Sequence, residues 1–141
     1  MTHTRNDIAA QFISALPHAR ALGLSLTDIG EGDATIILPY NESLIGDLDT
    51  GVVHGGAVSA LMDTCCGAAV MSHPEAGIAT ATIDLRIDYM RSAEPGAVIV
   101  ATAQCFHMTH SVAFVRATAN DGTSNIPVAT ATGTFAVERM T

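Results

Sequence analysis

The feature that most constrains the fold is residues 57–71, whose only polar side chains belong to Ser59, Asp63 and Thr64. A helix that is apolar nearly all round is normally buried, so we expect this segment to form a central helix ending near His73. Burying an unpaired carboxylate is costly or shifts its pKa, so Asp63 needs either a structural partner or a chemical task. From this helix alone, a structural hydrogen bond or ion pair and a catalytic role are equally open.

Two adjacent glycines, Gly55 and Gly56, stand where this helix begins. Without side chains they let the backbone come close to a ligand. The first N–H groups of a helix lack partners and lie at the positive end of its dipole, so they can stabilise a carbonyl oxygen that gains negative charge. Alone, the pair with His54 would indicate a flexible loop; together with Asp63 it indicates a site that combines a polarising amide with a carboxylate.

The spacing of these two groups restricts how they can act. Asp63 lies eight residues after Gly55, which is about 12 Å along one helix axis. They cannot reach one carbonyl from the same chain. A two-fold interface with antiparallel helices would bring Gly55 of one chain near Asp63 of its mate, so the hypothesis requires a dimer with two composite sites.

The rest of the chain predicts an α+β domain. Residues 6–22 have helical spacing interrupted by Pro17, and residues 40–53 form a loop rich in Asn, Asp and Gly. The predicted strands are residues 24–29, 34–39, 79–90, 97–107, 111–120 and 128–137. One long helix among antiparallel strands indicates a helix packed against a curved sheet.

Residues 79–90 alternate most regularly of these strands. Apolar residues occupy the odd positions from 81 to 89, including Ile83 and Tyr89, and polar residues occupy the even positions. This pattern predicts one long strand with a single apolar face.

Composition limits the possible functions. The 141 residues are 48% hydrophobic and 14% charged, with a formal net charge of −8. Long-range attraction to nucleic acid is therefore not expected. No stretch approaches transmembrane length and the first residues lack a signal-peptide pattern, so we expect neither a membrane partner nor export. The length fits one domain covering residues 1–141, of which 1–22 form an N-terminal helical segment.

Several residues that suggest other chemistry have simpler explanations. Cys65, Cys66 and Cys105 lie in apolar surroundings without flanking cations, which favours buried thiols in a reducing cytoplasm over a nucleophile or disulfides. His107 and His110 have no acidic or cysteine third ligand nearby, so no metal site is predicted. No nucleophile elbow or phosphate-binding glycine loop is present, and we expect no metal and no redox cofactor.

Three segments together resemble a known family. They are Val53-His54-Gly55-Gly56, then Leu61-Met62-Asp63-Thr64 with Gly67-Ala68-Ala69, and then Thr82-Ile83-Asp84-Leu85-Arg86-Ile87-Asp88-Tyr89-Met90-Arg91. From about Gly23 to Val137 the chain is similar to the hotdog-fold acyl-CoA thioesterases of the phenylacetic-acid-degradation (PaaI-like) type, in the wider 4-hydroxybenzoyl-CoA thioesterase superfamily. The resemblance implies the hotdog fold, a curved antiparallel sheet wrapped around one long central helix.

The resemblance also implies catalytic roles. The family aspartate falls on Asp63, as general base or nucleophile on the thioester. The amide that polarises the thioester carbonyl falls on Gly55, and the histidine that orders its loop falls on His54. A strand residue that helps hold the attacking water falls on Thr82.

One family position departs in this chain. Many members carry an asparagine shortly before the histidine, and here Asp47 is the nearest match, with Asp49 as the alternative.

The substrate-binding residues are expected around these groups. Gly56 and Val58 follow the polarising amide, and Leu44, Ile45, Leu61 and Met62 are expected with Val58 as pocket walls. For the coenzyme A phosphates, Arg91 is the main candidate, a solvated strand-end arginine being its alternative. The family's glycine-basic-serine turn becomes Thr109-His110-Ser111, which makes His110 and Ser111 weaker candidates.

These expectations amount to an acyl-CoA thioesterase that acts on an aryl or medium-chain acyl group. Coenzyme A is then part of the substrate and no cofactor is needed. The expected assembly is a homodimer or a homotetramer. Two alternatives remain, a hotdog dehydratase or hydratase and a non-catalytic acyl-CoA-binding protein.

Overall fold

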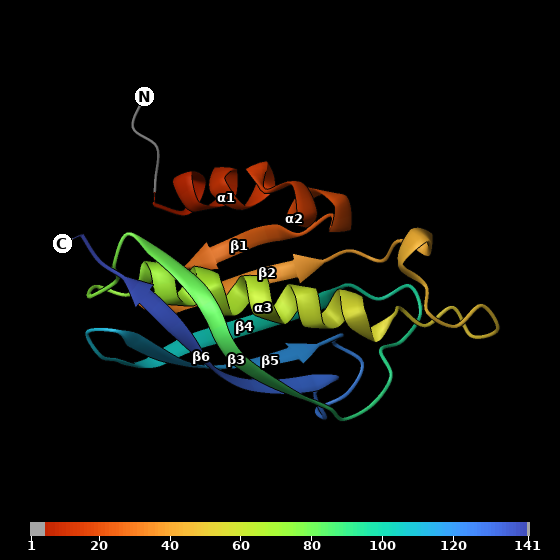
Figure 1. Ribbon diagram of the computed structural model, residues 1–141. Helices are drawn as coiled ribbons and strands as arrows, with labels where there is room; N and C mark the ends of the chain where they lie inside the picture. The colour runs from red at the N-terminus through yellow and green to blue at the C-terminus, as the bar shows by residue number, and fades with distance from the viewer. Residues whose placement is uncertain (1–4, 141) are drawn as a thin grey trace.

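The computed structural model describes residues 5–140. Within them, six strands form one antiparallel sheet in the order β1-β2-β4-β5-β6-β3, and the sheet curves so that β3 passes in front of the long helix α3 (Figure 1). The elements are α1 (Arg5–Ala15), α2 (Pro17–Leu22), β1 (Ser25–Ile29), β2 (Asp33–Leu38), the 3-10 turn η1 (Glu42–Leu44), α3 (Gly55–Ser72), β3 (Ala79–Tyr89), β4 (Ile99–Met108), β5 (Val112–Asn120) and β6 (Ala129–Glu138). The predicted hotdog fold is confirmed, and each predicted strand is present with its ends within two residues.

Helix α3 is buried on one face only. Its inner face packs on the sheet through residues with little or no exposure, namely Ala57, Val58, Leu61, Met62, Cys65, Cys66, Ala69 and Val70. The opposite face is half-buried and carries Ser59, Asp63 and Thr64. A helix apolar nearly all round is therefore not enclosed by its own chain, and Asp63 lies on the side that the sheet does not cover.

Strand β3 contains a β-bulge that the sequence pattern did not predict. The pairing of β3 with β6 shifts between Thr82 and Asp84. Ahead of the bulge the even residue Thr82 faces α3, and after it Leu85 and Ile87 are the more buried residues. The single apolar face expected for residues 79–90 is therefore wrong at Ile83, which is 60% exposed.

The N-terminal helices lie against the first strand edge. α1 packs along β1, and Asn6 links the two by accepting from the N–H of Ile29 at 3.2 Å and donating to Asp28 at 3.2 Å. Pro17 begins α2, as its missing N–H allows, and Gly23 ends it with φ 75°. No helix within residues 5–140 is long and apolar enough to cross a bilayer.

Candidate active site

His54 caps the N-terminus of α3. Its Nδ1 accepts a hydrogen bond from the N–H of Gly56 at 2.8 Å. A ring nitrogen that accepts carries no proton, so the imidazole in this arrangement is neutral with its N–H at Nε2. A Cβ at Gly56 would lie 2.9 Å from that Nδ1, and a Cβ at Gly46 would lie 2.7 Å from the Cα of His54. Both glycines are therefore needed to seat the histidine; Gly46 was not predicted.

Gly55 is different from its neighbour. A Cβ built on it would meet nothing closer than a ring carbon of Tyr89 at 3.6 Å, an ordinary contact. Among the described residues its N–H has no acceptor, as expected for the first residue of a helix. Nothing in the chain itself therefore requires glycine at this position, and the amide stays available to a ligand.

The Asp63 carboxylate is held by a hydroxyl. Thr82 donates from Oγ1 to Oδ1 of Asp63 at 2.7 Å, across from β3 to α3. Within residues 5–140 no arginine pairs with Asp63 and no hydrogen bond reaches its Oδ2. The structural alternative of an arginine or backbone partner is therefore not what the fold provides. A half-buried carboxylate with one oxygen held and the other open suits a group that attacks a substrate or activates water.

One protomer does not assemble the two halves of this chemistry. Gly55 and Asp63 lie on the same helix, separated by two turns, as the spacing predicted. Strand β3 reaches both, since Thr82 binds Asp63 and Tyr89 donates its hydroxyl to the carbonyl oxygen of Gly55 at 2.9 Å.

The two tyrosines of the chain both fix the loop before α3. Besides Tyr89 on Gly55, Tyr40 donates to the carbonyl oxygen of Gly51 at 2.8 Å, where Gly51 has φ 77°. These residues were missed in the sequence. Tyr40 stands six residues before Gly46, but Tyr89 lies 33 residues beyond Gly56, so its contact with Gly55 had no local signal in the sequence.

Asp47 lies in that loop but serves a turn in this protomer. Its Oδ1 accepts from the N–H of Asp49 at 3.0 Å, and both side chains are exposed. Leu48 between them is 96% exposed at the loop tip. No hydrogen bond joins Asp47 or Asp49 to Asp63 within the described chain, so the role carried over to Asp47 stays a prediction.

Arg91 is not free to hold a phosphate, which corrects the main sequence candidate. Its guanidinium donates two hydrogen bonds to the carboxylate of Asp121, of 2.6 and 2.9 Å. Its other donors bind the carbonyl oxygens of Ile126 and Ser92 and the side chain of Asn120, so all five are used. The hydrogen bonds from Arg91 hold the pKa of the Asp121 carboxyl well below its usual range. Arg91 is a structural residue that closes the end of β5.

The turn between β4 and β5 is also braced from within the chain. Arg139 donates from Nε to the carbonyl oxygen of His110 at 2.7 Å and from Nη2 to that of Glu75 at 2.9 Å. His110 and Ser111 are exposed beside it. Their expected contact with coenzyme A stays a prediction.

The cysteines fit the packing role expected of them. Burial raises the pKa of Cys65 to about 12, and burial together with the charges of Cys65 and Asp63 raises that of Cys66. Neither is a thiolate near neutral pH. Within residues 5–140, no group of three or more His, Cys, Asp or Glu side chains is arranged to hold a metal ion.

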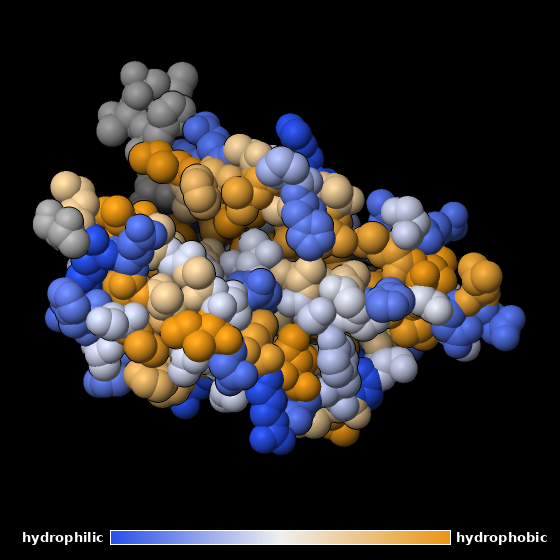
Figure 2. Space-filling model, in the orientation of Figure 1, coloured by the Kyte–Doolittle hydropathy of each residue, from blue (hydrophilic) through white to orange (hydrophobic). Residues whose placement is uncertain are grey.

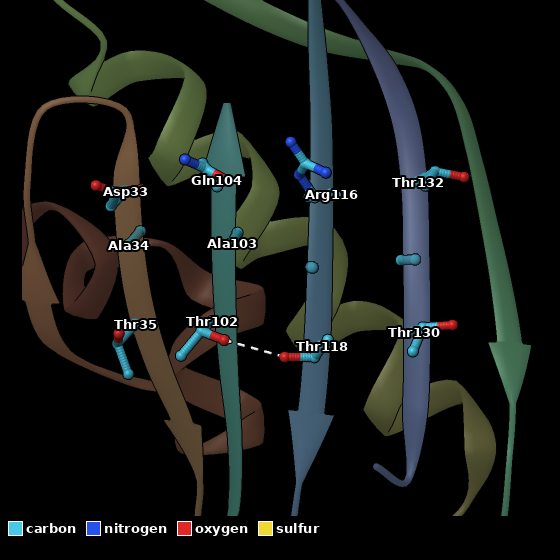
Figure 3. A pocket seen from close by; sticks show the side chains of 12 residues that line it. Asp33, Ala34, Thr35, Thr102, Ala103, Gln104, Arg116, Thr118, Thr130 and Thr132 are labelled. Atoms are coloured by element: carbon cyan, nitrogen blue, oxygen red, sulfur yellow. Dashed lines mark hydrogen bonds between the residues drawn. The ribbon is translucent and has the colours of Figure 1, made fainter. Parts of the chain in front are cut away.

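One surface hollow of the described residues does not border these groups. It measures about 620 Å³ and lies on the outer face of the sheet, with the helices behind (Figure 3). Its most regular feature is a row of threonines on neighbouring strands, Thr35, Thr102, Thr118 and Thr130. Neither Gly55 nor Asp63 borders it, so we do not assign the chemistry to this hollow.

Another hollow, of about 330 Å³, lies beside the start of α3. Its lining consists of His18, Leu22, Ser43, Leu44, Ile45, His54, Gly56, Ala57 and Ala60. Leu44 and Ile45 were expected as pocket walls, whereas Val58, Leu61 and Met62 are buried against the sheet and do not line it. The helix turns these three inward, so in one protomer they are core residues.

Comparisons with known sequences indicate the family of this chain. The family model described as Thioesterase superfamily matches residues 50–127, which include the start of α3, Asp63 and β3. The medium/long-chain acyl-CoA thioesterase YigI of Salmonella typhimurium is 25% identical over 143 residues, covering 92% of this chain and 91% of that protein. A putative esterase of Halobacterium salinarum is 40% identical over 75 residues, about half of either chain.

Solved structures show the same fold. A protein of Pseudomonas aeruginosa superposes with a TM-score of 0.82 at 38% identity, covering 94% of this chain and 98% of that chain. The N33D mutant of the phenylacetic acid degradation protein PaaI from Thermus thermophilus gives a TM-score of 0.74 at 27% identity, covering 88% and 99%. These relatives support the resemblance to PaaI-like proteins.

Proposed function

This chain belongs to the Thioesterase superfamily, and from that premise we propose that it hydrolyses acyl-CoA at a site shared by two protomers. Water and the thioester give a carboxylic acid and the free thiol of coenzyme A. The single observation that carries the proposal is that one helix carries two unused groups within the described chain. These are the free amide of Gly55 at its start and the carboxylate of Asp63, of which Thr82 holds only one oxygen. No metal or redox cofactor has a role in it.

The proposed reaction begins with the thioester carbonyl oxygen accepting from the N–H of Gly55. That donor stabilises the negative charge as the carbonyl carbon becomes tetrahedral, an effect worth about a hundredfold or more in rate. Oδ2 of Asp63 from the partner then either takes a proton from a water that attacks the carbon, or attacks the carbon itself to give a mixed anhydride that water afterwards hydrolyses. The carbon–sulfur bond breaks and the thiolate leaves with the electron pair. The hydrogen bond from Thr82 keeps the carboxylate of Asp63 in a fixed orientation.

A second copy of the chain is proposed to dock against β3 and the half-buried face of α3. β3 is one of the two edge strands of the sheet and is 11 residues long, and an uncovered edge of this length is a template for pairing with another chain. Ile83, Tyr89 and Met90 are each more than half exposed. Apolar side chains gather over this edge and over the loop that precedes α3 (Figure 2). A two-fold axis beside β3 with antiparallel α3 helices would set Gly55 against the partner's carboxylate. Mass in solution distinguishes this dimer from a tetramer.

The test is Asp63→Asn, which keeps the size of the side chain and its hydrogen bond from Thr82 but removes the base. We expect thiol release from acyl-CoA to fall by at least about a thousandfold with an unchanged oligomer mass and melting temperature. Near-normal turnover in this variant would exclude the mechanism. A single turnover in ¹⁸O-water then tests the nucleophilic route, because only that route can leave the label in the carboxylate of the protein.

The names of the relatives suggest which acyl groups to try. YigI is named for medium and long chains and PaaI for phenylacetic acid degradation. Measuring the rate of thiol release from a series of straight-chain and aryl acyl-CoA esters ranks these acyl groups as substrates. A dehydratase or hydratase would instead change the enoyl absorbance without releasing thiol, and a binding protein would hold acyl-CoA without releasing thiol.

A further inference from the structure

The hollow beside the start of α3 exists because this helix turns only small residues toward α2. Gly56, Ala57 and Ala60 line it from α3, whereas Leu22 lines it from α2. Leu22 is only half-buried even though it borders the hollow from a helix that packs on the domain. Covering such apolar surface is favourable by about 25 cal/mol per Å². The gap therefore favours an apolar occupant.

Most residues that line this hollow are apolar. Five lining residues are apolar, and no lysine, arginine, aspartate or glutamate is among the rest. Ser43 is already engaged, since its N–H and hydroxyl both donate to Asn41 at 2.9 Å. A ligand group carrying a carboxylate would lose its hydration here without gaining a lysine or arginine partner, which is costly. The lining selects uncharged groups.

The hollow adjoins the proposed polarising amide. His54 and Gly56, the residues on either side of Gly55, both border it. A ligand whose carbonyl oxygen accepts from the N–H of Gly55 has the hollow next to that carbonyl. Ligand sites in proteins generally measure about 300–1,000 Å³, and this hollow lies at the small end of that range.

We propose that this hollow binds the acyl chain of the thioester and that α2 is the wall that sets its length. The proposal rests on the proposed function and adds to it the class of acyl group: uncharged, apolar and of medium length. It also assigns a role to the N-terminal helical segment, which the thioesterase family match does not cover. The segment borders the substrate through His18 and Leu22.

The experiment changes the size of the hollow from both sides. Ala60→Phe fills it from α3 and is expected to lower kcat/KM for octanoyl-CoA relative to acetyl-CoA by at least about tenfold. Leu22→Ala enlarges it from α2 and is expected to raise kcat/KM for dodecanoyl-CoA relative to octanoyl-CoA. Opposite shifts from two helices are not expected from a general loss of stability.

The matched control is Ala21→Phe, which adds the same ring to α2 at an exposed position that does not line the hollow. It should keep the chain-length profile of the natural protein. A second readout uses the Asp63→Asn background, in which the affinity for octanoyl-CoA relative to coenzyme A is measured without turnover. Ala60→Phe is expected to remove the gain in affinity from the octanoyl group.

An unchanged chain-length profile in both Ala60→Phe and Leu22→Ala would overturn the proposal. So would an octanoyl preference in binding that Ala60→Phe leaves intact. These outcomes differ from failure of the proposed function, in which the natural protein releases no thiol from any ester while the binding comparison still reports on the hollow.

Discussion

At the start of α3, Gly55 and Gly56 lack side chains for different reasons. A methyl group on Gly56 would press on His54, the cap of the helix, whereas a methyl group on Gly55 would meet only an ordinary contact with Tyr89. The constraint on Gly56 lies inside the chain. Nothing within the chain constrains Gly55, and in the proposed reaction its missing side chain leaves room for the thioester.

This difference predicts opposite effects on stability. Gly55→Ala should keep or slightly raise the melting temperature, because alanine favours a helix over glycine, yet lower kcat/KM by about a hundredfold as its methyl group displaces the thioester carbonyl. Gly56→Ala should displace the imidazole and cost about 1 kcal/mol of stability through the lost cap, together with activity. Thermal melts and thiol-release kinetics of both variants check this. A strongly destabilised Gly55→Ala would contradict the reasoning.

The pair of Arg91 and Asp121 predicts how stability depends on pH. The pKa of Asp121 is lowered in the folded protein, so the pair adds stability above the unfolded value near about 4 and loses it as the pH falls further. Asp121→Asn should therefore melt several degrees lower at pH 7, with a difference that shrinks steadily below about pH 4. A difference that stays constant down to pH 2.5 would show that the charge is not responsible.

At the scale of elements, β3 has two tasks that a regular strand cannot combine. It presents Thr82 to Asp63 and, after the bulge, presents Tyr89 to Gly55 from the alternate set of positions. Gly133 on β6 makes the bulge possible, because a Cβ there would lie 2.6 Å from the carbonyl oxygen of Asp84. Bulges beside active sites commonly redirect a side chain in this way.

Gly133→Ala should therefore lower the free energy of unfolding by at least about 1 kcal/mol and reduce kcat as β3 shifts and Thr82 is misaligned. Gly30→Ala is the matched control, since its added methyl would meet nothing nearer than 3.5 Å. Urea unfolding and thiol-release rates measure the two effects. Full activity in a destabilised Gly133→Ala would separate the bulge from catalysis.

Periodicity predicts most strands here because buried and exposed residues alternate along β2, β4 and β5. It could not predict the bulge, since Ile83 continues the alternation that the fold interrupts. It also could not show that the guanidinium of Arg91 is paired with Asp121, thirty residues further along the chain. The assignment of Thr82 beside Asp63 came from the family resemblance, and the contact is present.

At the scale of the whole molecule, the chain has a central helix that it covers on one side only. The uncovered side carries Asp63, and the adjoining sheet edge is β3. In this account both are completed by a second copy, which also supplies the missing half of each reaction centre. The account therefore depends on whether Gly55 and Asp63 act from different chains.

Hybrid dimers test this dependence most directly. One hybrid joins an Asp63→Asn chain to a Gly55→Ala chain, and the control hybrid joins a chain with both changes to an unchanged chain. Shared sites predict that the first hybrid keeps one intact centre and about half of the natural activity, whereas the control is nearly inactive. A site contained within each chain predicts the reverse, an inactive first hybrid and a half-active control, and that result would contradict the account.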